Sequence, residues 1–416
     1  METKKLLIVL FCLFCSCVSV SAQRKPSYQP MTQNEQKDIE QSLYNRGISD
    51  FLVTQAIPIG PISLTNVLNM VSHNPIEGTR MRLSLQTNNK FSKRLGFSGM
   101  VAYGTEDKKL KYSIGVAYNF AKKPKGVYSF PASTLSLTYG YNTYIPSYSN
   151  YDIAYFSLGD WDRFYFGRKE SVVLSFLQDF KLGISLRPFV SYEKTDSYLL
   201  YDKGNITQLL SPFKYLENYA GGLNLSFSPL KDKTSLLNIL NSRFYYFPTT
   251  LSLTYTYNYQ KYQGANYYHY AYLSAQHRFY FRPIALDIKV IGGKIFGESY
   301  DYTYFSPNYR VGDVSNMFGF NLYSDVEMRF KEYVQTFLQF NLGGVLLDNI
   351  KFIKQFKPNE FINFKALFTN DYQPYMEVGV GVDHILTFLG VEIVRRIASE
   401  NPMKMPQWGV KLRCTL

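Results

Sequence analysis

Residues that could act as a nucleophile beside a neighbouring base are few in this sequence. No histidine is followed two residues later by serine, which is the local pairing that outer-membrane lipases use. The histidines are His73, His269, His277 and His384. Cys414 is the one cysteine beyond residue 17, and a lone cysteine can form neither an internal disulfide nor a zinc site. We therefore expect no catalytic residue, no metal site and no cofactor, with a lipid-modifying enzyme as a distant alternative.

One pair of carboxylates could bind a ligand. Asp160 and Asp162 flank Trp161 within a tyrosine-rich stretch, so paired acids and a stacking ring could hold calcium or a sugar. An aromatic surface loop at a membrane interface explains the same residues, and we prefer that interpretation.

Basic residues outnumber acidic ones. The whole chain carries +13, and removing the two lysines and one glutamate of the signal peptide described below leaves +12. Such a surface attracts anionic lipid head groups, lipopolysaccharide or acidic substrates. Four cations face inward near the ends of the predicted strand region: Arg80, Arg82, Lys411 and Arg413. If the first and last strands pair, these cations repel one another across a candidate seam that could open. The alternative is neutralisation by Glu377, Glu392 and Asp287.

The elements that would position these residues are strands. In 110–120 every second residue is apolar or aromatic, whereas the interleaved residues are Lys, Ser, Gly, Ala and Asn. Strict alternation of this length predicts a strand with two unlike faces. The pattern recurs in 81–85, 95–103, 135–141, 223–227, 251–259, 284–290 and 376–382, and 105–109 reads as a compact polar hairpin. Aromatic residues make up 17% of the chain, which suits strands that end at a membrane interface.

These strands predict an all-β fold, a transmembrane antiparallel β-barrel of about 14–16 strands, over residues 77–416. A large secreted β-sandwich fits the composition almost as well. The barrel is favoured by the length of the strands, by the secretion signal and by a chain that stops on a strand. Residues 172–180 and 330–342 alternate less cleanly, so the strand count stays open.

The last ten residues resemble the C-terminal signal that the barrel assembly machinery reads, which makes that machinery an expected partner during biogenesis. The alternation places Trp408 and Val410 on one face and Lys411 and Arg413 on the other. The residues of the signal are Gln407, Gly409, Leu412, Cys414 and Leu416. Leu416 departs from the pattern, because an aromatic residue is usual at the end.

The first residues are those of an exported protein. Residues 1–22 combine two lysines, a short apolar run and small residues before Gln23, which is typical of a secretory signal peptide. The apolar run is too short for a membrane-spanning helix. With the strand pattern, this predicts a location in the outer membrane of a Gram-negative cell.

Residues 23–76 are predicted to be a short periplasmic segment. Thr32 and Glu35 have the spacing of a capping box for a short helix that ends near Gly47. Residues 51–71 are apolar but interrupted by proline and glycine, and could be a strand-like or helical plug element. We prefer a simple tether that lies across the mouth of the barrel.

Several motifs are shared with one family: 74–78, 80–83, 91–94, 102–109, 320–322 and 343–350. Through them the chain resembles an uncharacterised outer-membrane family in which a barrel usually follows a carboxypeptidase-like regulatory domain. That barrel is thought to be related to BamA-type surface-antigen barrels. The resemblance implies a fold and a location but no established role. Residues 23–76 are too short for the regulatory domain or for the chain-binding repeats of assembly proteins, so an assembly role would need a periplasmic partner protein.

One loop has a second resemblance. Arg310 and Gly312 lie in the longest late loop and resemble the loop tip that folds into the lumen of BamA-type barrels. We weight an ordinary extracellular loop above that interpretation.

Three functions remain open. The first is a surface-antigen barrel that assists insertion or export of envelope components with a periplasmic partner. The second is a channel for anionic solutes, and the third is a structural or adhesive surface barrel with tyrosine-rich loops. Outer-membrane lipid and lipopolysaccharide are expected partners, and nucleic acid is not.

Overall fold

The computed structural model describes residues 56–74, 76–144, 163–180, 182–202, 205–208, 215–229, 247, 249–261, 265–281, 284–299, 304–305, 307, 317–323, 329–350, 358–385, 389–397 and 407–414. All of them belong to the unit Thr54–Leu416. The predicted signal peptide, the predicted helix beginning at Thr32 and the Asp160–Asp162 pair lie outside the described residues. Within these ranges, no helix is both long and apolar enough to cross a membrane.

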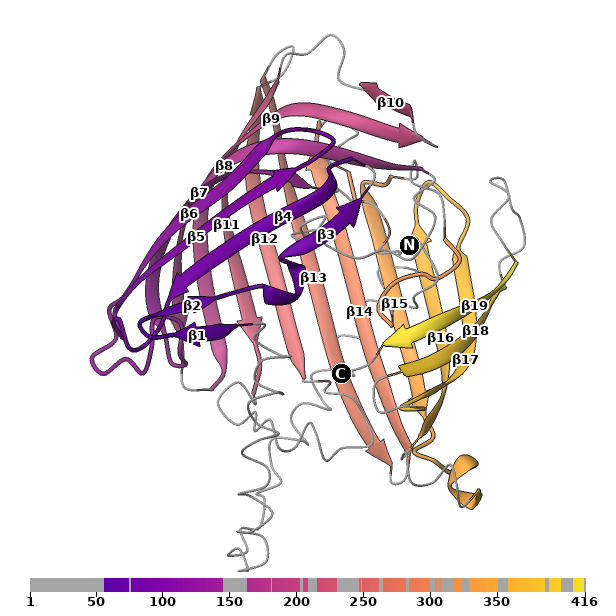
Figure 1. Cartoon of the computed structure of the whole chain (residues 1–416). Coiled ribbons are helices and arrows are strands. Elements are labelled where there is room, and N and C mark those ends of the chain that lie inside the picture. The colour runs from indigo at the N-terminus through magenta and orange to yellow at the C-terminus, as the bar shows by residue number, and fades with distance from the viewer. Residues whose placement is uncertain are drawn as a thin grey trace, which may run out of the picture. The chain divides into compact units, whose positions relative to one another are not determined.

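The described chain is built almost wholly from strands (Figure 1). In chain order its elements are β1 (Ile57–Ile59), β2 (Ile62–Leu64), the 3-10 helix η1 (Val67–Asn69), β3 (Val71–Asn74), β4 (Gly78–Thr87), β5 (Leu95–Gly104), β6 (Leu110–Asn119), β7 (Ser133–Tyr144), β8 (Arg163–Asp179), β9 (Ile184–Asp202), β10 (Asn205–Gln208), β11 (Leu216–Phe227), β12 (Thr250–Lys261), β13 (Ala265–Phe281), β14 (Ile284–Gly297), β15 (Glu332–Asn341), the 3-10 helix η3 (Leu347–Asn349), β16 (Asn359–Thr369), β17 (Tyr375–Asp383), β18 (Leu389–Arg396) and β19 (Trp408–Cys414). Of these nineteen described strands, fifteen have seven or more residues and fall within the predicted number, while β1, β2, β3 and β10 are short additions.

Every strand pairing in the described chain is antiparallel. Each long strand pairs with the next one along the chain, from β4 to β9 and from β11 to β19. β9 pairs directly with β11 along most of its length, and β10 pairs with its last residues. Hairpin connections of this kind make an up-and-down sheet, and Figure 1 shows that the sheet curls and so acquires an inner and an outer face.

The sheet begins before residue 77. β2 pairs with the end of β4, with Leu64 opposite Leu85, and β3 pairs with its start, with Asn74 opposite Gly78. Gly60 has φ 63 and turns the chain between β1 and β2, so the glycine and proline that interrupt this segment form a hairpin. The tether interpretation is therefore wrong for residues 57–74, and the strand-like alternative describes them.

The two faces of the sheet have reversed polarity. Ile114 on β6 and Val380 on β17 expose 61% and 57% of their surface, whereas Lys111 and Glu377 on the other face of the same strands are fully buried. The same outward exposure is found for Met81, Leu83, Val101, Leu137, Leu223, Leu253, Ile393 and Val410. Proteins in water bury apolar side chains and leave charges outside, so this arrangement suits a sheet whose outer surroundings are apolar.

Apolar residues on the inner side gather around one short segment, residues 317–323, which we call the docked segment. It belongs to the long connection between β14 and β15. The buried cluster consists of Ile76, Phe166, Ile291, Phe320, Tyr323, Phe330, Tyr333, Phe337, Leu367 and Tyr375. The interior of the curled sheet therefore holds part of a loop as well as the strand side chains.

Candidate functional site

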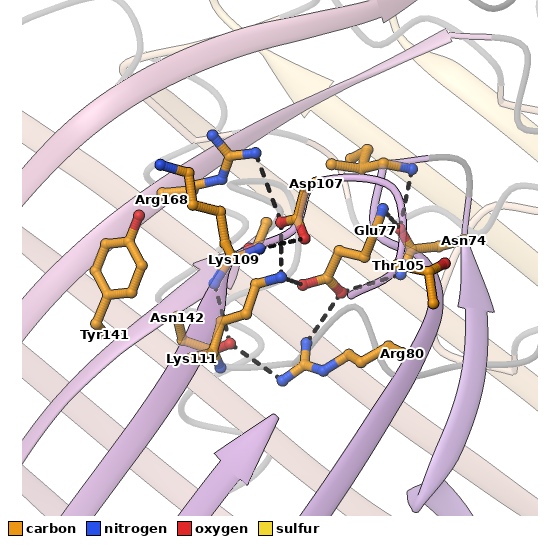
Figure 2. A network of polar contacts seen from close by, with 12 residues as sticks. Asn74, Glu77, Arg80, Thr105, Asp107, Lys109, Lys111, Tyr141, Asn142 and Arg168 are labelled. Carbon is orange, nitrogen blue, oxygen red and sulfur yellow. Dashed lines mark hydrogen bonds and ion pairs between the residues drawn. The ribbon is translucent and has the colours of Figure 1, made fainter. Parts of the chain in front are cut away.

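Glu77, in the turn between β3 and β4, is the centre of a buried polar network that we call the Glu77 cluster (Figure 2). Its Oε2 accepts hydrogen bonds from Nη1 of Arg80 at 3.2 Å and from Nδ2 of Asn74 at 3.1 Å, and its Oε1 lies 2.7 Å from Nζ of Lys111. The four residues are fully buried. Burial alone would raise the pKa of the Glu77 carboxyl, but the two cations outweigh burial and hold that pKa below its ordinary value.

The hairpin at residues 105–109 supplies the second acid of the Glu77 cluster. Oδ2 of Asp107 lies 2.6 Å from Nζ of Lys111 and 3.6 Å from Nη2 of Arg168. The hairpin rests on the turn before β4, because the N–H of Glu106 donates to the carbonyl of Glu77 at 3.0 Å. The predicted hairpin is thus confirmed, and it joins two turns through one charge network (Figure 2).

Arg80 also reaches across the interior. Its Nη2 donates to Oδ1 of Asn142 on β7 at 3.2 Å, so the cluster connects β4, β6 and β7. Sequence reasoning placed Lys111 on the inner face of its strand but did not pair it with Glu77. Alternation reports a side chain's face and carries no information on which distant strand it meets.

Arg413, on β19, is the centre of a second buried network. Its Nε lies 2.9 Å from Oδ1 of Asp383, its Nη1 lies 3.5 Å from Oε2 of Glu392, and its Nη2 donates to Oε1 of Gln339 at 2.8 Å. The guanidinium lies 4.0 Å from the centroid of the Phe361 ring. These contacts tie the last strand to β15, β16, β17 and β18 on the inner face.

The docked segment is held by the same inner wall. Glu377 accepts main-chain N–H groups, from Asn321 to Oε2 at 2.9 Å and from Leu322 to Oε1 at 2.7 Å. Nζ of the fully buried Lys365 donates to the carbonyl of Gly319 at 2.8 Å. These charged side chains therefore satisfy main-chain hydrogen-bonding groups of the buried docked segment.

Aromatic contacts fix the other side of the docked segment. The ring of Phe318 stacks on Phe247 at a centroid distance of 5.4 Å, and Phe320 lies 5.5 Å from Phe337. The connection between β14 and β15 leaves one end of the strands, whereas Phe247 precedes β12 at the opposite end. The docked segment therefore reaches far enough along the interior to meet a residue that enters from the other end.

The four predicted seam cations are divided between separate contacts. Arg80 bonds within the Glu77 cluster and Arg413 with Asp383 and Glu392. Nε of Arg82 donates to Ser84 at 2.9 Å, and Lys411 lies opposite Glu392 in the register of β18 and β19. Glu392 thus serves as the expected neutralising acid for the last strand. Of the other two expected acids, Asp287 bonds to Arg278 and Glu377 holds the docked segment.

The direct pairing of the Arg80 strand with the last strand is not found. The edge of β4 that does not pair with β5 is covered by β2 and β3, and the N–H of Arg82 on that edge donates to the carbonyl of Met70 at 2.7 Å. In the described chain, β19 has a register with β18, and no register pairs it with β3 or β4. The two edges of the described sheet are therefore β19 and the short strands β1–β3, and no register in the described chain joins them.

The remaining predicted residues lie partly outside the described chain. Arg310, Gly312 and Leu416 are not among the described residues. The docked segment belongs to the same connection as Arg310 and Gly312, for which the ordinary extracellular loop stays a prediction. Gln407 directly precedes β19, and Gly409, Leu412 and Cys414 belong to it; Leu412 is outward-facing and 49% exposed.

Two parallel rows of side chains cross the outer face, and sequence reasoning missed both. Directly opposite one another on successive strands from β7 to β13 lie Tyr139, Val172, Tyr192, Tyr219, Tyr259 and Tyr267. The next outward row along β8, β9, β11 and β12 is Glu170, Lys194, Glu217 and Lys261, with alternating charge. Tyr139 donates to Glu170 at 2.6 Å and Tyr192 to Glu217 at 3.3 Å. A tyrosine row beside a charged row is typical of the level where lipid meets water.

Comparison with solved structures identifies BamA-type barrels as structural neighbours. BamA from Haemophilus ducreyi lacking POTRA domains 1-3 matches with a TM-score of 0.50 at 9% identity, over 82% of this chain and 68% of that one. CdiB from Acinetobacter baumannii matches with a TM-score of 0.43 at 11% identity, over 82% of this chain and 57% of that one. CdiB from Escherichia coli matches with a TM-score of 0.44 at 10% identity, over 86% and 62%. This chain spans less than two thirds of either CdiB structure.

No protein-family model and no curated protein matches the sequence. The fold is that of a BamA-type barrel, all-β and antiparallel. These matches do not show the carboxypeptidase-like domain of the family that the motifs resemble.

Proposed function

We propose that this chain is an outer-membrane barrel of the surface-antigen type that assists insertion or export of other envelope components, together with a periplasmic partner protein. The observation that carries the proposal is the unequal seam. β19 has seven residues and a register with β18 alone among the described strands, while the other edge of the described sheet is made of β1, β2 and β3, of three or four residues each. Short strands offer few hydrogen bonds, so this seam is the easiest place to open the sheet.

The reversed polarity of the sheet supports the location. An apolar outer face with a tyrosine row and a charged row fits a lipid bilayer and its boundary with water. The buried charges fit an interior in which each charge contacts an opposite charge or a hydrogen-bonding group. The proposed orientation puts the end that carries the β1–β2 hairpin and the end of β19 in the periplasm, because the part of the proposed periplasmic segment that precedes β1 leads into that hairpin.

The docked segment argues against the alternative of a passive channel for anionic solutes. Residues 317–323 and Phe247 meet within the interior, and Glu377 and Lys365 hold the segment there. In a planar bilayer the protein should therefore conduct far less than an open porin. The adhesive alternative rests on tyrosine-rich loops at residues 146–168, most of which lie outside the described chain.

A disulfide placed across the seam tests the proposal. In a Cys414→Ser background, His73→Cys on β3 is combined in turn with Val410→Cys or Leu412→Cys on β19, all at outward-facing positions. Cells that lack the protein are complemented with each variant, and the protein content of their outer membrane is measured. We expect an oxidised seam pair to abolish complementation and a reductant to restore it.

The matched control is Ile393→Cys with Val410→Cys, which are directly opposite one another in β18 and β19. This pair should cross-link without loss of complementation, because it joins strands that are already paired. Full complementation by a completely cross-linked seam pair would reject a moving seam and leave a closed barrel as the better account.

A further inference from the structure

Two neighbouring turns at one end of the sheet carry a concentration of positive charge that neither network uses. The turn between β4 and β5 (residues 88–94) and the connection between β6 and β7 (residues 120–132) contain no aspartate or glutamate. Their cations are Lys90, Lys93, Arg94, Lys122, Lys123 and Lys125. The five lysines are exposed. We call this surface the basic rim.

The basic rim is built on an ordered scaffold. Arg94 donates from Nη2 to the carbonyl of Lys122 at 3.0 Å and from Nη1 to that of Asn119 at 3.3 Å, which fastens one turn to the other. Nδ2 of Asn119 donates to the carbonyls of Gly126 at 3.0 Å and Val127 at 3.1 Å. The lysines are therefore held together on one rigid surface, although five like charges repel each other without a counterion.

Exposed aromatic rings lie directly beside the lysines on the outer face. Phe91, Phe97 and Phe120 expose 47%, 46% and 55% of their surface. Phe91 packs edge-on against Phe97 at 6.0 Å, and Phe120 packs against Tyr118 at 4.8 Å. These rings continue the outward apolar face of β5 and β6, so they belong to the part of the surface that would contact acyl chains.

The spacing along β6 agrees with the thickness of a membrane. Tyr112, near the tyrosine row, and Phe120, beside the basic rim, are separated by eight residues, which span about 26 Å along an extended strand and about 20 Å along the membrane normal at a strand tilt of about 40°. The apolar band of an outer-membrane barrel is about 25 Å tall. The basic rim therefore lies at head-group level, at the boundary opposite to the tyrosine row.

We propose that the basic rim binds the phosphates of anionic phospholipid head groups, with the rings of Phe91, Phe97 and Phe120 among the acyl chains below them. The choice of phospholipid over lipopolysaccharide rests on the orientation in the proposed function, which puts the end with the β1–β2 hairpin in the periplasm. The basic rim lies at that same end, because the Asn88 side chain beside it donates to the carbonyl of Gly60 at 2.9 Å. Each lysine near an anionic surface contributes attraction that falls with salt.

The test uses the purified full-length chain in a neutral detergent and measures binding of phosphatidylglycerol and of phosphatidylcholine by native mass spectrometry. We expect a clear preference for phosphatidylglycerol that weakens at high salt. The variant Lys122→Gln with Lys123→Gln should lower the affinity for phosphatidylglycerol roughly 10- to 30-fold and leave the weak binding of phosphatidylcholine unchanged. The matched control is Lys108→Gln with Lys109→Gln, an adjacent exposed lysine pair in the hairpin at the other end.

Equal binding of the two lipids, or an equal loss in both variants, would overturn the proposal. Binding of an acidic periplasmic protein through these lysines, with no lipid preference, would assign the rim to a protein partner instead. Purified lipopolysaccharide added in a third series should not displace phosphatidylglycerol; if it binds more tightly, the orientation is wrong. The measurement needs no insertion or export activity, so it can fail while the seam experiment succeeds, and the reverse.

Discussion

At the scale of single residues, the interior depends on matched charges that are far apart in the sequence. Glu77, in the turn before β4, and Lys111, on β6, are both fully buried, and so are Asp383 and Glu392 around Arg413. A charge held away from water costs several kcal/mol unless an opposite charge is in contact with it. The conformation that brings both partners together is therefore strongly favoured over one that separates them.

The substitution Glu77→Gln tests this dependence on matched charges at the centre of the Glu77 cluster. The substitution leaves Arg80 and Lys111 without one of their acids, and we expect a loss of about 3–5 kcal/mol in the free energy of unfolding. Urea unfolding of the protein in detergent measures it. Glu106→Gln, at an exposed acid of the adjoining hairpin, should change stability by less than about 0.5 kcal/mol. Adding Arg80→Met to Glu77→Gln should recover part of the loss, because it removes a cation that the Glu77 carboxylate had neutralised; if it deepens the loss, the ion pair is not the cause.

The outer face is tested by a charge. Val116 is outward-facing, 38% exposed and midway between Tyr112 and Phe120. Val116→Arg should therefore reduce the free energy of folding into a bilayer by roughly 2–4 kcal/mol, whereas Ile114→Arg, opposite Tyr139 of the tyrosine row, should cost less. The neighbouring Ser113→Asn faces inward and should cost much less. Equal damage from Val116→Arg and Ser113→Asn, measured by folding into lipid vesicles, would mean that the faces are assigned wrongly.

Not every inward-facing position tolerates a larger side chain, and sequence alternation does not show which positions are restricted. Gly381 belongs to the inward set of β17, and the sequence suggests that a modest polar residue is harmless there. A Cβ at Gly381 would meet the Phe361 ring and the main-chain carbonyl of Val391. Substitution therefore requires a shift of the neighbouring strand, because a backbone atom cannot move aside as a side chain can.

At the scale of elements, strands with clean alternation were predictable. The outward set of β6 and the opposite facing of Trp408 and Arg413 on β19 are as expected from the sequence. β1, β2 and β3 were not recognised, because strands of three or four residues are too short to show a period. The docked segment was also missed, since its hydrogen bonds come from Glu377 and Lys365, which are distant in sequence.

Glu377→Gln tests how the docked segment is held. Glutamine keeps the shape but replaces one acceptor by a donor, so an N–H of Asn321 or Leu322 loses its partner at a cost of about 1–3 kcal/mol. The undocked population should rise roughly 5- to 150-fold, which chymotryptic cleavage after Phe320 or Tyr323 reports. Glu298→Gln, at an exposed acid in the same connection, should leave cleavage unchanged. Cleavage of the wild-type segment as fast as that of Glu377→Gln would show that it is not docked in solution.

At the scale of the whole molecule, the face polarity and the two outer rows together specify a place in a membrane. The rows run in direct register across the strands from β7 to β13, and the basic rim lies at the other end of β6. No short window of sequence contains such a row, because its successive members are 8 to 44 residues apart and align only through strand register. The barrel class was predictable from alternation, but the position of its boundaries required the register.

Location and depth can be measured together. Fractionation should recover the mature chain, beginning at Gln23, in the outer membrane and resistant to carbonate extraction. In a Cys414→Ser background, Glu217→Cys in the charged row should react with a membrane-impermeant maleimide on intact cells. Leu223→Cys, six residues further along the same outward face of β11, should be protected, because it lies within the apolar band. Both cysteines should react in detergent after unfolding, which controls for intrinsic reactivity. Labelling of Leu223→Cys on intact cells as fast as Glu217→Cys would place that face in water, and recovery of the chain as a soluble periplasmic protein would reject the barrel in a membrane altogether.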